Sequence, residues 1–131
     1  MNKVAILLVD DEQEFLELMQ RRLGRRGFEV SVASSGPEAL ILARERDFDV
    51  VLLDVLMPGM DGLETLRRLR EVRPDTEVVM LTGHANIEAA ERGMALGIFD
   101  YLIKPVAINE LIMKLGDAAQ HRRLVHGGGA S

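Results

Sequence analysis

The chain of 131 residues contains no cysteine and a single tyrosine. The absence of cysteine excludes disulfide bonds, thiolate metal sites and cysteine nucleophiles, so any chemistry must come from oxygen and amine groups. No apolar run approaches the roughly 20 residues that a transmembrane helix needs. The first residues lead into a strand-like segment rather than a signal sequence. We therefore expect a soluble, cytoplasmic protein that does not contact a membrane.

An excess of positive charge is also missing, since the formal net charge is -5 and the pI is about 5.2. DNA affinity depends mainly on Lys and Arg neutralising phosphates, which argues against direct nucleic acid binding. Arginine clusters do occur on candidate helices, around positions 21–26 and 67–70. Because glutamates are interleaved with them, we interpret these clusters as solvated helix faces, with a contact to an acidic partner as the alternative.

The composition is that of one globular domain, with 47% hydrophobic and 28% charged residues and a mean hydropathy of +0.06. No internal repeat or change of composition marks a second domain. We expect the domain to span residues 1–122 and residues 123–131 to form a flexible tail or linker. A natural terminus, the start of a linker and an expression artefact all remain open for this tail.

Hydrophobic patterning predicts five strands alternating with five helices. Continuous apolar runs at 4–9, 50–53 and 78–81 predict strands that are buried on both faces, and two more strands are predicted at 29–33 and 98–103. Apolar residues recur at helical spacing between them. The stripes of the first, third and fifth helices are Phe15, Leu18, Met19 and Leu23; Leu63, Leu66, Leu69 and Val72; and Ile108, Leu111, Ile112, Leu115 and Ala119.

Local signals mark several helix ends. Gly27 and Pro74 follow the first and third helices as stop signals, and Ser35 with Pro37 begins the second. Such regular β/α alternation predicts an α/β fold with a parallel, doubly wound sheet and helices on both faces. The pattern alone leaves the strand order open.

Five polar residues stand at the downstream ends of predicted strands: Asp10, Asp11, Asp54, Thr82 and Lys104. In an open parallel sheet, these ends line one crevice. Clustered carboxylates repel one another unless a cation neutralises them, and Mg²⁺ prefers oxygen ligands while keeping waters that a phosphate can displace. We therefore predict a Mg²⁺ site, which Mn²⁺ could also fill, with Asp11 and Asp54 as direct ligands.

Each residue also has a purely structural interpretation. The acidic pair could favour a helix N-terminus, Thr82 could form a turn with Gly83, and Lys104 could form a salt bridge, which we expect at rest with Asp54. Together they fit phosphoryl chemistry. A carboxylate beside a metal and an ammonium can attack phosphorus, while Lys104 and the hydroxyl of Thr82 stabilise the transferring oxygens.

Four segments in the right order and spacing carry a family resemblance: Val-Asp-Asp-Glu at 9–12, Leu-Leu-Asp-Val-Leu-Met-Pro-Gly-Met-Asp-Gly at 52–62, Leu-Thr-Gly at 81–83 and Asp-Tyr-Leu-Ile-Lys-Pro at 100–105. Jointly they resemble the receiver domain of two-component response regulators, over about residues 3–120. Any one of these motifs alone would be weak evidence, whereas the four together are specific.

The resemblance implies a flavodoxin-like fold with strand order 2-1-3-4-5, which makes the acidic pair a neighbour of Asp54. It further implies that Asp54 is the phosphoacceptor, that Asp11 and Asp54 bind Mg²⁺ directly and that Asp10 helps through water. The backbone carbonyl of Leu56 is the implied third protein ligand. The peptide bond between Lys104 and Pro105 is usually cis in the family.

A switch is also implied, in which Thr82 is drawn toward the phosphate and Tyr101 moves inward. The donor would be a sensor histidine kinase or a phosphotransfer protein. We predict that a weakly held fourth helix near 87–96, which contains Gly93, forms an interaction face with strand five and helix five. Its partner would be an effector protein, an attached output domain or a second copy bound after phosphorylation.

The remaining candidates receive simpler interpretations. We expect apolar Leu56 to shield the acyl phosphate from water and Met57 to pack within its loop. A histidine without an orienting partner is weak evidence for catalysis, so we interpret His84 as an exposed loop residue and His121 and His126 as tail residues.

Other protein classes fit the sequence less well. A phosphatase of the haloacid-dehalogenase type expects Asp-x-Asp after the first strand and a late acidic pair, whereas this chain has Asp10-Asp11-Glu12. A flavin-binding module needs a Ser/Thr/Gly-rich loop there, and nucleotide-binding glycine signatures are absent. We therefore expect a phosphoacceptor switch that acts only on itself, either standing alone or as part of a longer regulator or hybrid kinase.

Overall fold

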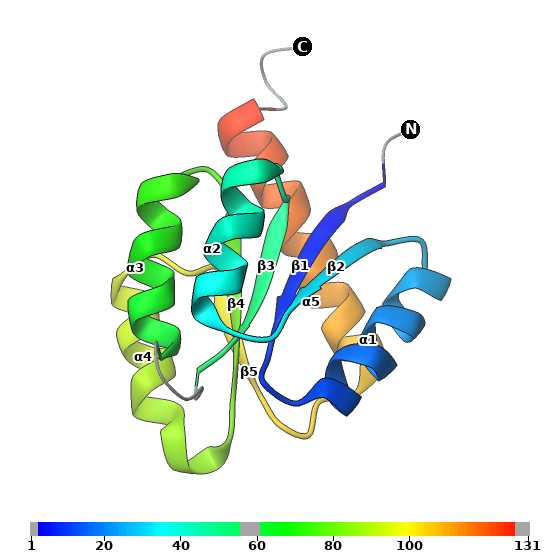
Figure 1. The fold of residues 1–131 in the computed structure, drawn as a ribbon, viewed down its shortest axis with the longest axis horizontal. Helices are drawn as coiled ribbons and strands as arrows, with labels where there is room; N and C mark the ends of the chain where they lie inside the picture. The colour runs from blue at the N-terminus through cyan, green and yellow to red at the C-terminus, as the bar shows by residue number, and fades with distance from the viewer. Residues whose placement is uncertain (1–2, 56–60, 128–131) are drawn as a thin grey trace.

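The computed structural model describes residues 3–55 and 61–127. Within these residues, five strands alternate with five helices, as the sequence predicts (Figure 1). The strands are β1 (Ala5–Val9), β2 (Glu29–Ala33), β3 (Val50–Asp54), β4 (Glu77–Thr82) and β5 (Asp100–Ile103). The helices are α1 (Gln13–Arg25), α2 (Gly36–Glu45), α3 (Gly62–Val72), α4 (Ile87–Ala95) and α5 (Ile108–Arg122), with a short 3₁₀ helix η1 (His84–Asn86) and a π-helical segment η2 (Arg123–Gly127).

All neighbouring strands pair in parallel, in the order β2-β1-β3-β4-β5. The flavodoxin-like topology implied by the resemblance is thereby confirmed. The register sets Val9 opposite Leu53 across β1 and β3, and Asp54 opposite Leu81 across β3 and β4. The ends of β1, β3 and β4 therefore lie level with one another at one edge of the sheet.

Helices cover both faces of the sheet, α1 and α5 on one and α2, α3 and α4 on the other (Figure 1). Each face buries its own apolar cluster. The predicted stripes supply most of the contacts, although the α1 stripe omitted Leu16, which is almost fully buried. Every residue of β3 is buried, which agrees with the expectation that continuous apolar runs form strands covered on both sides.

Capping interactions account for the helix boundaries. The hydroxyl of Ser35 accepts a hydrogen bond from the backbone N–H of Glu38 at 3.2 Å, and Asp61 does the same for Glu64 at 2.9 Å. Gly27, just beyond α1, has a φ of 94°, a conformation that favours glycine. The predicted cap at Ser35 and the predicted stop at Gly27 are both confirmed.

The fifth strand is shorter than predicted, since it begins at Asp100 and not at position 98. Gly97, with a φ of 89°, turns the chain out of α4, and the following residues are still leaving this turn. Asp100 then accepts a hydrogen bond on its side chain from the N–H of Tyr101. Apolar patterning cannot detect such a turn, because the buried residues Ile98 and Leu102 lie on both sides of its end.

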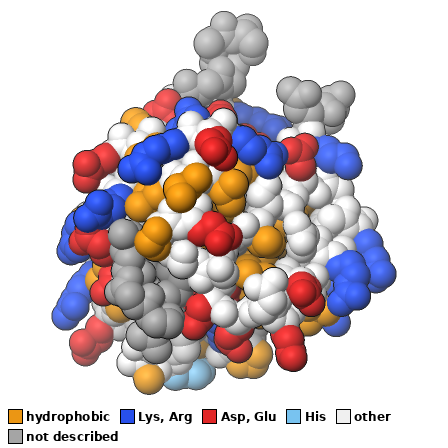
Figure 2. Space-filling model, in the orientation of Figure 1, with side chains coloured by type: hydrophobic (Ala, Val, Ile, Leu, Met, Phe, Trp, Pro, Cys, Tyr) orange, Lys and Arg blue, Asp and Glu red, His pale blue; other side chains and the backbone are white. Residues whose placement is uncertain are grey.

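Helical structure continues past α5 through η2, and the boundary between domain and tail stays a prediction. Figure 2 shows acidic and basic side chains interspersed over the visible face of the molecule. No helix among residues 3–55 and 61–127 is both long and apolar enough to span a bilayer.

Candidate functional site

Three carboxylates meet where β1 and β3 end. One ligand oxygen from each of Asp10, Asp11 and Asp54 lies within 4.8 Å of the other two. Asp10 is fully buried, Asp54 is 7% exposed and Asp11 is exposed to solvent. The structure thus brings the predicted acidic residues together because β1 and β3 are adjacent strands of the sheet.

Asp10 is held by the protein on both carboxylate oxygens. Its Oδ1 accepts a hydrogen bond from the backbone N–H of Glu12 at 2.9 Å, and its Oδ2 accepts one from Lys104 Nζ at 3.1 Å. These contacts fix the buried carboxylate before any ion arrives. A buried charge needs such partners because burial without them would cost several kcal/mol.

The ammonium of Lys104 is closer to Asp10 than to the acid that we expected to be its resting partner. Lys104 Nζ lies 3.1 Å from Asp10 Oδ2 and 3.8 Å from Asp54 Oδ2. The expected ion pair with Asp54 is therefore confirmed, and the structure adds a shorter one with Asp10 that the sequence analysis did not single out. The physical reason is that fully buried Asp10 gains most from a charged donor, whereas the sequence could not rank two acids at neighbouring strand ends.

Several acids together control the charge of Lys104. Burial lowers the pKa of Lys104, but the hydrogen bond that Lys104 donates to Asp10 and the negative charges of Asp54, Asp10 and Glu12 outweigh burial, so the pKa is raised above its ordinary value of 10.5. The contribution of Glu12, whose Oε1 lies 3.9 Å from Nζ, was not expected from the sequence. Lys104 is consequently a permanent cation at the site near neutral pH.

Phe15 is a site residue that the sequence analysis placed only in the core. Its ring centroid lies 4.9 Å from Lys104 Nζ, which is within cation–π range. The available signal was proximity in sequence, because Phe15 lies in the first turn of α1, only a few residues after Asp11.

Thr82 and Tyr101 lie on the two neighbouring strands β4 and β5. The Thr82 side chain is buried, and its hydroxyl donates a hydrogen bond to the carbonyl of Gly83 at 3.0 Å. The backbone N–H of Lys104 donates to the carbonyl of Thr82 at 2.7 Å, which ties the two strand ends together. Tyr101 is half-buried and lines an open groove with His84.

The donor set fits a hard divalent cation. Carboxylate oxygens are the ligands that Mg²⁺ prefers, and three of them beside one ammonium leave net negative charge for the ion to neutralise. Leu56, the implied source of a backbone ligand, and Met57 lie outside the described residues. The peptide bond between Lys104 and Pro105 is cis, as the resemblance implies.

Close packing places α3 against the end of β3. A Cβ atom on Gly62 would lie 2.6 Å from the carbonyl oxygen of Val55 and 2.8 Å from that of Asp54. The backbone N–H of Gly62 donates to that same Val55 oxygen at 3.0 Å. Glycine at this position therefore allows the first turn of α3 to contact the strand that carries Asp54.

The surroundings of the histidines and of one arginine agree only in part with the sequence-based expectations. His84 is exposed in η1, as predicted. His121 is not a tail residue, because it lies in α5 and its Nδ1 contacts buried Glu77. Arg70 is not merely solvated, since it donates to the carbonyls of Thr76 and Gly97. The contacts of His121 with Glu77 and of Arg70 with Gly97 join elements that are distant in the chain, so the sequence could not predict them.

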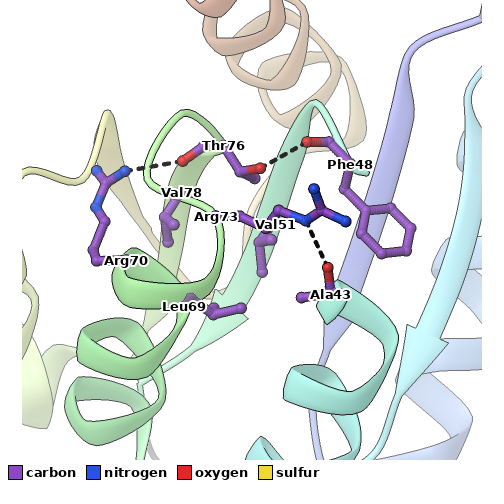
Figure 3. Close-up of a pocket in the computed structure, with 8 residues that line it drawn as sticks. All are labelled: Ala43, Phe48, Val51, Leu69, Arg70, Arg73, Thr76 and Val78. Carbon is purple, nitrogen blue, oxygen red and sulfur yellow. Dashed lines mark hydrogen bonds between the residues drawn. The ribbon is translucent and has the colours of Figure 1, made fainter. Parts of the chain in front are cut away.

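A separate enclosed pocket lies between α2 and α3, away from the acidic cluster (Figure 3). Its lining is mainly apolar, and its polar groups serve the backbone: Arg73 Nε donates to the carbonyl of Ala43 at 2.8 Å and Thr76 Oγ1 to that of Phe48 at 3.0 Å. We interpret it as a packing gap between two helices.

Comparison with known proteins identifies the family. A model of the response regulator receiver domain matches residues 6–116. The transcriptional regulatory protein ZraR of Klebsiella oxytoca is 37% identical over 122 residues, which are 93% of this chain and 28% of that protein. An uncharacterized transcriptional regulatory protein of Bacillus subtilis, YkoG, is 39% identical over 115 residues, covering 88% of this chain and 50% of that protein.

A solved structure agrees with these matches. A response regulator receiver domain from Clostridium thermocellum superposes with a TM-score of 0.89 at 35% identity, covering 93% of this chain and 98% of that one. The chain spans between about a quarter and a half of the length of the two transcriptional regulators. From the matching model, the relatives and the shared fold, we conclude that this chain belongs to the response regulator receiver domain family.

Proposed function

We propose that Asp54 accepts a phosphoryl group from a sensor histidine kinase or a phosphotransfer protein in a Mg²⁺-dependent reaction. One observation carries the proposal: the carboxylate of Asp54 is almost buried, yet it shares a 4.8 Å cluster with two other acids and lies 3.8 Å from the ammonium of Lys104. That environment suits a nucleophile that receives a highly charged group.

The transfer moves a phosphoryl group from a histidine of the donor to Asp54. An oxygen of Asp54 attacks the phosphorus, the phosphorus–nitrogen bond to the donor histidine breaks, and its electron pair leaves with the imidazole. An acyl phosphate forms on Asp54. When bound, Mg²⁺ or Mn²⁺ neutralises charge on the transferring oxygens.

Asp11, Asp54 and the carbonyl of Leu56 would hold the metal ion directly, with Asp10 acting through water. The two hydrogen bonds that already engage both oxygens of Asp10 support this indirect role. Lys104 supplies a second positive charge to the phosphoryl oxygens. The chain thereby acts as a phosphoacceptor that modifies only itself, not as an enzyme with a separate substrate.

Phosphorylation would change the bonding of Thr82. Its hydroxyl now donates to the carbonyl of Gly83, and rotation about χ1 lets the same hydrogen point to a phosphoryl oxygen. Movement of the strand end leaves room for Tyr101, which is half-buried on β5, to turn inward. A phosphoryl group adds about -1.5 to -2 charge, which is enough to bias such a two-state element.

The output surface would consist of α4, β5 and α5. Met94 on α4 and Met113 on α5 are 45% and 69% exposed, so this face offers apolar contacts. Its partner would be an effector protein, an attached output domain or a second copy of the chain, in the cytoplasm and without direct nucleic acid binding by this domain. A coupling of about 1–3 kcal/mol suffices for the switch.

Acetyl phosphate with Mg²⁺ tests the proposal. We expect intact-mass spectrometry to show one added phosphoryl group, localised to Asp54 and lost in Asp54→Asn, while Asp117→Asn on the exposed side of α5 keeps it. Labelling that survives Asp54→Asn contradicts the assignment. Repeated turnover of phosphomonoesters would instead identify a phosphatase.

Hydrogen exchange tests the output face. With the phosphate mimic beryllofluoride, we expect the amides of α4, β5 and α5 to change protection while those of α2 stay constant. Unchanged exchange in the first three elements would contradict the switch.

Leu56→Asn should alter the dephosphorylation rate if Leu56 shields the acyl phosphate.

A further inference from the structure

Phe15 and Lys104 come from opposite halves of the chain and lie in contact beside the acidic cluster. Lys104 Nζ lies 4.9 Å from the centroid of the Phe15 ring, within the about 6 Å over which a ring face attracts a cation. Phe15 is half-buried in the first turn of α1 and packs against the apolar cluster beneath α1 and α5. The core therefore fixes the ring, and the ring offers the ammonium a fixed surface.

A lysine side chain needs such support because its four-carbon stem rotates freely. Lys104 follows the edge strand β5, whereas Asp10 follows β1, and two strands separate them in the sheet. The side chain of Lys104 crosses that distance, and it is 26% exposed. In the structure it is held by the carboxylates at 3.1, 3.8 and 3.9 Å and by the ring of Phe15.

The contacts of Lys104 with Asp10 and Asp54 are shared with the proposed metal site, whereas its contacts with the Phe15 ring and with exposed Glu12, at 3.9 Å, are not. A divalent cation among Asp10, Asp11 and Asp54 competes for the same oxygens and repels the ammonium. Hard cations prefer oxygen ligands, so the face of Phe15 stays available to Lys104. The ring of Phe15 is thus the half-buried contact of Nζ that does not depend on the charge state of the acidic cluster, since the other contact outside that cluster is with exposed Glu12.

We propose that Phe15 is a positioning residue, whose ring holds the Lys104 ammonium beside the transferring phosphoryl group when a metal ion occupies the carboxylates. This inference rests on the proposed phosphoacceptor function. A core role alone, which the apolar spacing of α1 also predicts, would need the volume of Phe15 but not its ring electrons.

NMR of the unphosphorylated full chain separates the two roles. A ring face close to Nζ shifts the neighbouring methylene protons of Lys104 upfield, and we expect this shift in the wild type and in Phe15→Tyr but not in Phe15→Leu. Phe28→Leu removes an aromatic ring from the same cluster just before β2, at the opposite edge of the sheet, and should leave the shift in place. An identical Lys104 signal in wild type and Phe15→Leu overturns the proposal.

Phosphorylation kinetics provide the second readout. With saturating Mg²⁺, we expect Phe15→Leu to slow labelling of Asp54 by acetyl phosphate about 2- to 10-fold, the range of a partly desolvated cation–π contact. Replacing Phe15 with pentafluorophenylalanine keeps the ring shape, reverses its quadrupole and should slow labelling similarly, even if the leucine variant folds poorly. Phe15→Tyr should retain the wild-type rate.

A double variant decides whether the effect passes through Lys104. In a Lys104→Ala background, Phe15→Leu should cause no further slowing, and an equal slowing there overturns the proposal. The NMR shift does not require phosphorylation. Failure of acetyl phosphate to label the wild type would therefore refute the proposed function, whereas loss of the ring-current difference would refute only the role of Phe15.

Discussion

Lys104 and Asp10 stand 94 positions apart in the sequence, yet the ammonium of one donates a hydrogen bond to the carboxylate of the other at 3.1 Å. This pair joins the last strand of the sheet to β1 and spans the site that contains Asp54. The site is therefore an ion-paired assembly, in which the positive charge that the proposed phosphoryl transfer requires is already in place.

We first predict that Asp10→Asn lowers the pKa of Lys104. Burial favours the neutral amine, and the variant removes one of the charges that now outweigh burial and replaces a carboxylate acceptor with a weaker amide oxygen. NMR titration of the Lys104 side chain should show the decrease. Asp11→Asn is the matched control, because the groups that raise this pKa are Asp10, Asp54 and Glu12; an equal effect of both variants would contradict the pairing.

The same pair gives a pH dependence of stability. Because the folded pKa of Lys104 exceeds its ordinary value of 10.5, the protonated lysine stabilises the fold fully below about pH 10.5 and loses this contribution as pH rises through the folded value. Urea unfolding across alkaline pH should show a steeper loss of stability in the wild type than in Asp10→Asn. Parallel curves would count against this linkage.

Two glycine substitutions should act in opposite directions. Gly62→Ala forces a Cβ to within 2.6 Å of the Val55 carbonyl, so either the start of α3 or the end of β3 must shift. We expect a destabilisation of about 1–3 kcal/mol, as for other overpacked sites, together with slower labelling of Asp54. Urea unfolding and the acetyl phosphate assay measure the two effects.

Gly116→Ala is the control for this substitution. It lies inside α5, and no atom approaches within 4 Å of the position its Cβ would take. We expect a stabilisation of about 0.5–1 kcal/mol because alanine has the higher helix propensity. Destabilisation by Gly116→Ala, or tolerance of Gly62→Ala, would show that packing at these positions differs from the structure.

His121 should contribute to stability through Glu77. The Glu77 side chain is 7% exposed, and His121 Nδ1 contacts its carboxylate. His121 also packs against Phe99 in a tilted arrangement, with ring centroids 5.4 Å apart and an angle of 53° between the ring planes. We expect His121→Phe, which keeps a ring, to cost about 1–3 kcal/mol because the buried acceptor loses a partner.

Thermal unfolding checks this prediction. His84→Ala serves as the control, since His84 is exposed in η1 and should change the melting temperature little. In a Glu77→Gln background, His121→Phe should cost clearly less than in the wild type. Equal losses in both backgrounds would assign the effect to packing and not to the contact with Glu77.

Arg122 should anchor the end of α5. Its Nη2 lies 2.9 Å from both carboxylate oxygens of Asp47, and its Nη1 lies 3.0 Å from Asp49 Oδ1. Burial lowers the pKa of Arg122, but its hydrogen bonds and ion pairs with the two aspartates outweigh burial and raise it. Because lysine cannot reproduce this bidentate geometry, we expect Arg122→Lys to lose about 1–2 kcal/mol in urea unfolding.

An exposed arginine provides the comparison for that variant. Arg67→Lys alters a solvent-exposed pair with Glu64 at 3.7 Å and should change stability by less than about 0.5 kcal/mol. If both substitutions have the same small effect, the contacts of Arg122 do not anchor α5.

The amino-acid sequence by itself determined the order of elements and the chemical character of the site. Continuous apolar runs such as 50–53 and 78–81 predicted strands covered on both sides, and Ser35, Gly27 and Pro74 marked helix ends through local backbone preferences. The sequence also placed Asp54, Thr82 and Lys104 at strand ends, because hydrophobic patterning reports where each strand stops. These features depend on interactions between near neighbours in the chain.

Only the tertiary structure decided which of these residues touch. It ranked Asp10 before Asp54 as the partner of Lys104, brought Phe15 under the ammonium and moved His121 from a presumed tail to buried Glu77. Each contact joins elements far apart in sequence, and its geometry follows from strand order, register and helix packing together. The local sequence pattern carries no information on the distances between these side chains, because those distances depend on how the two layers of helices pack against the sheet.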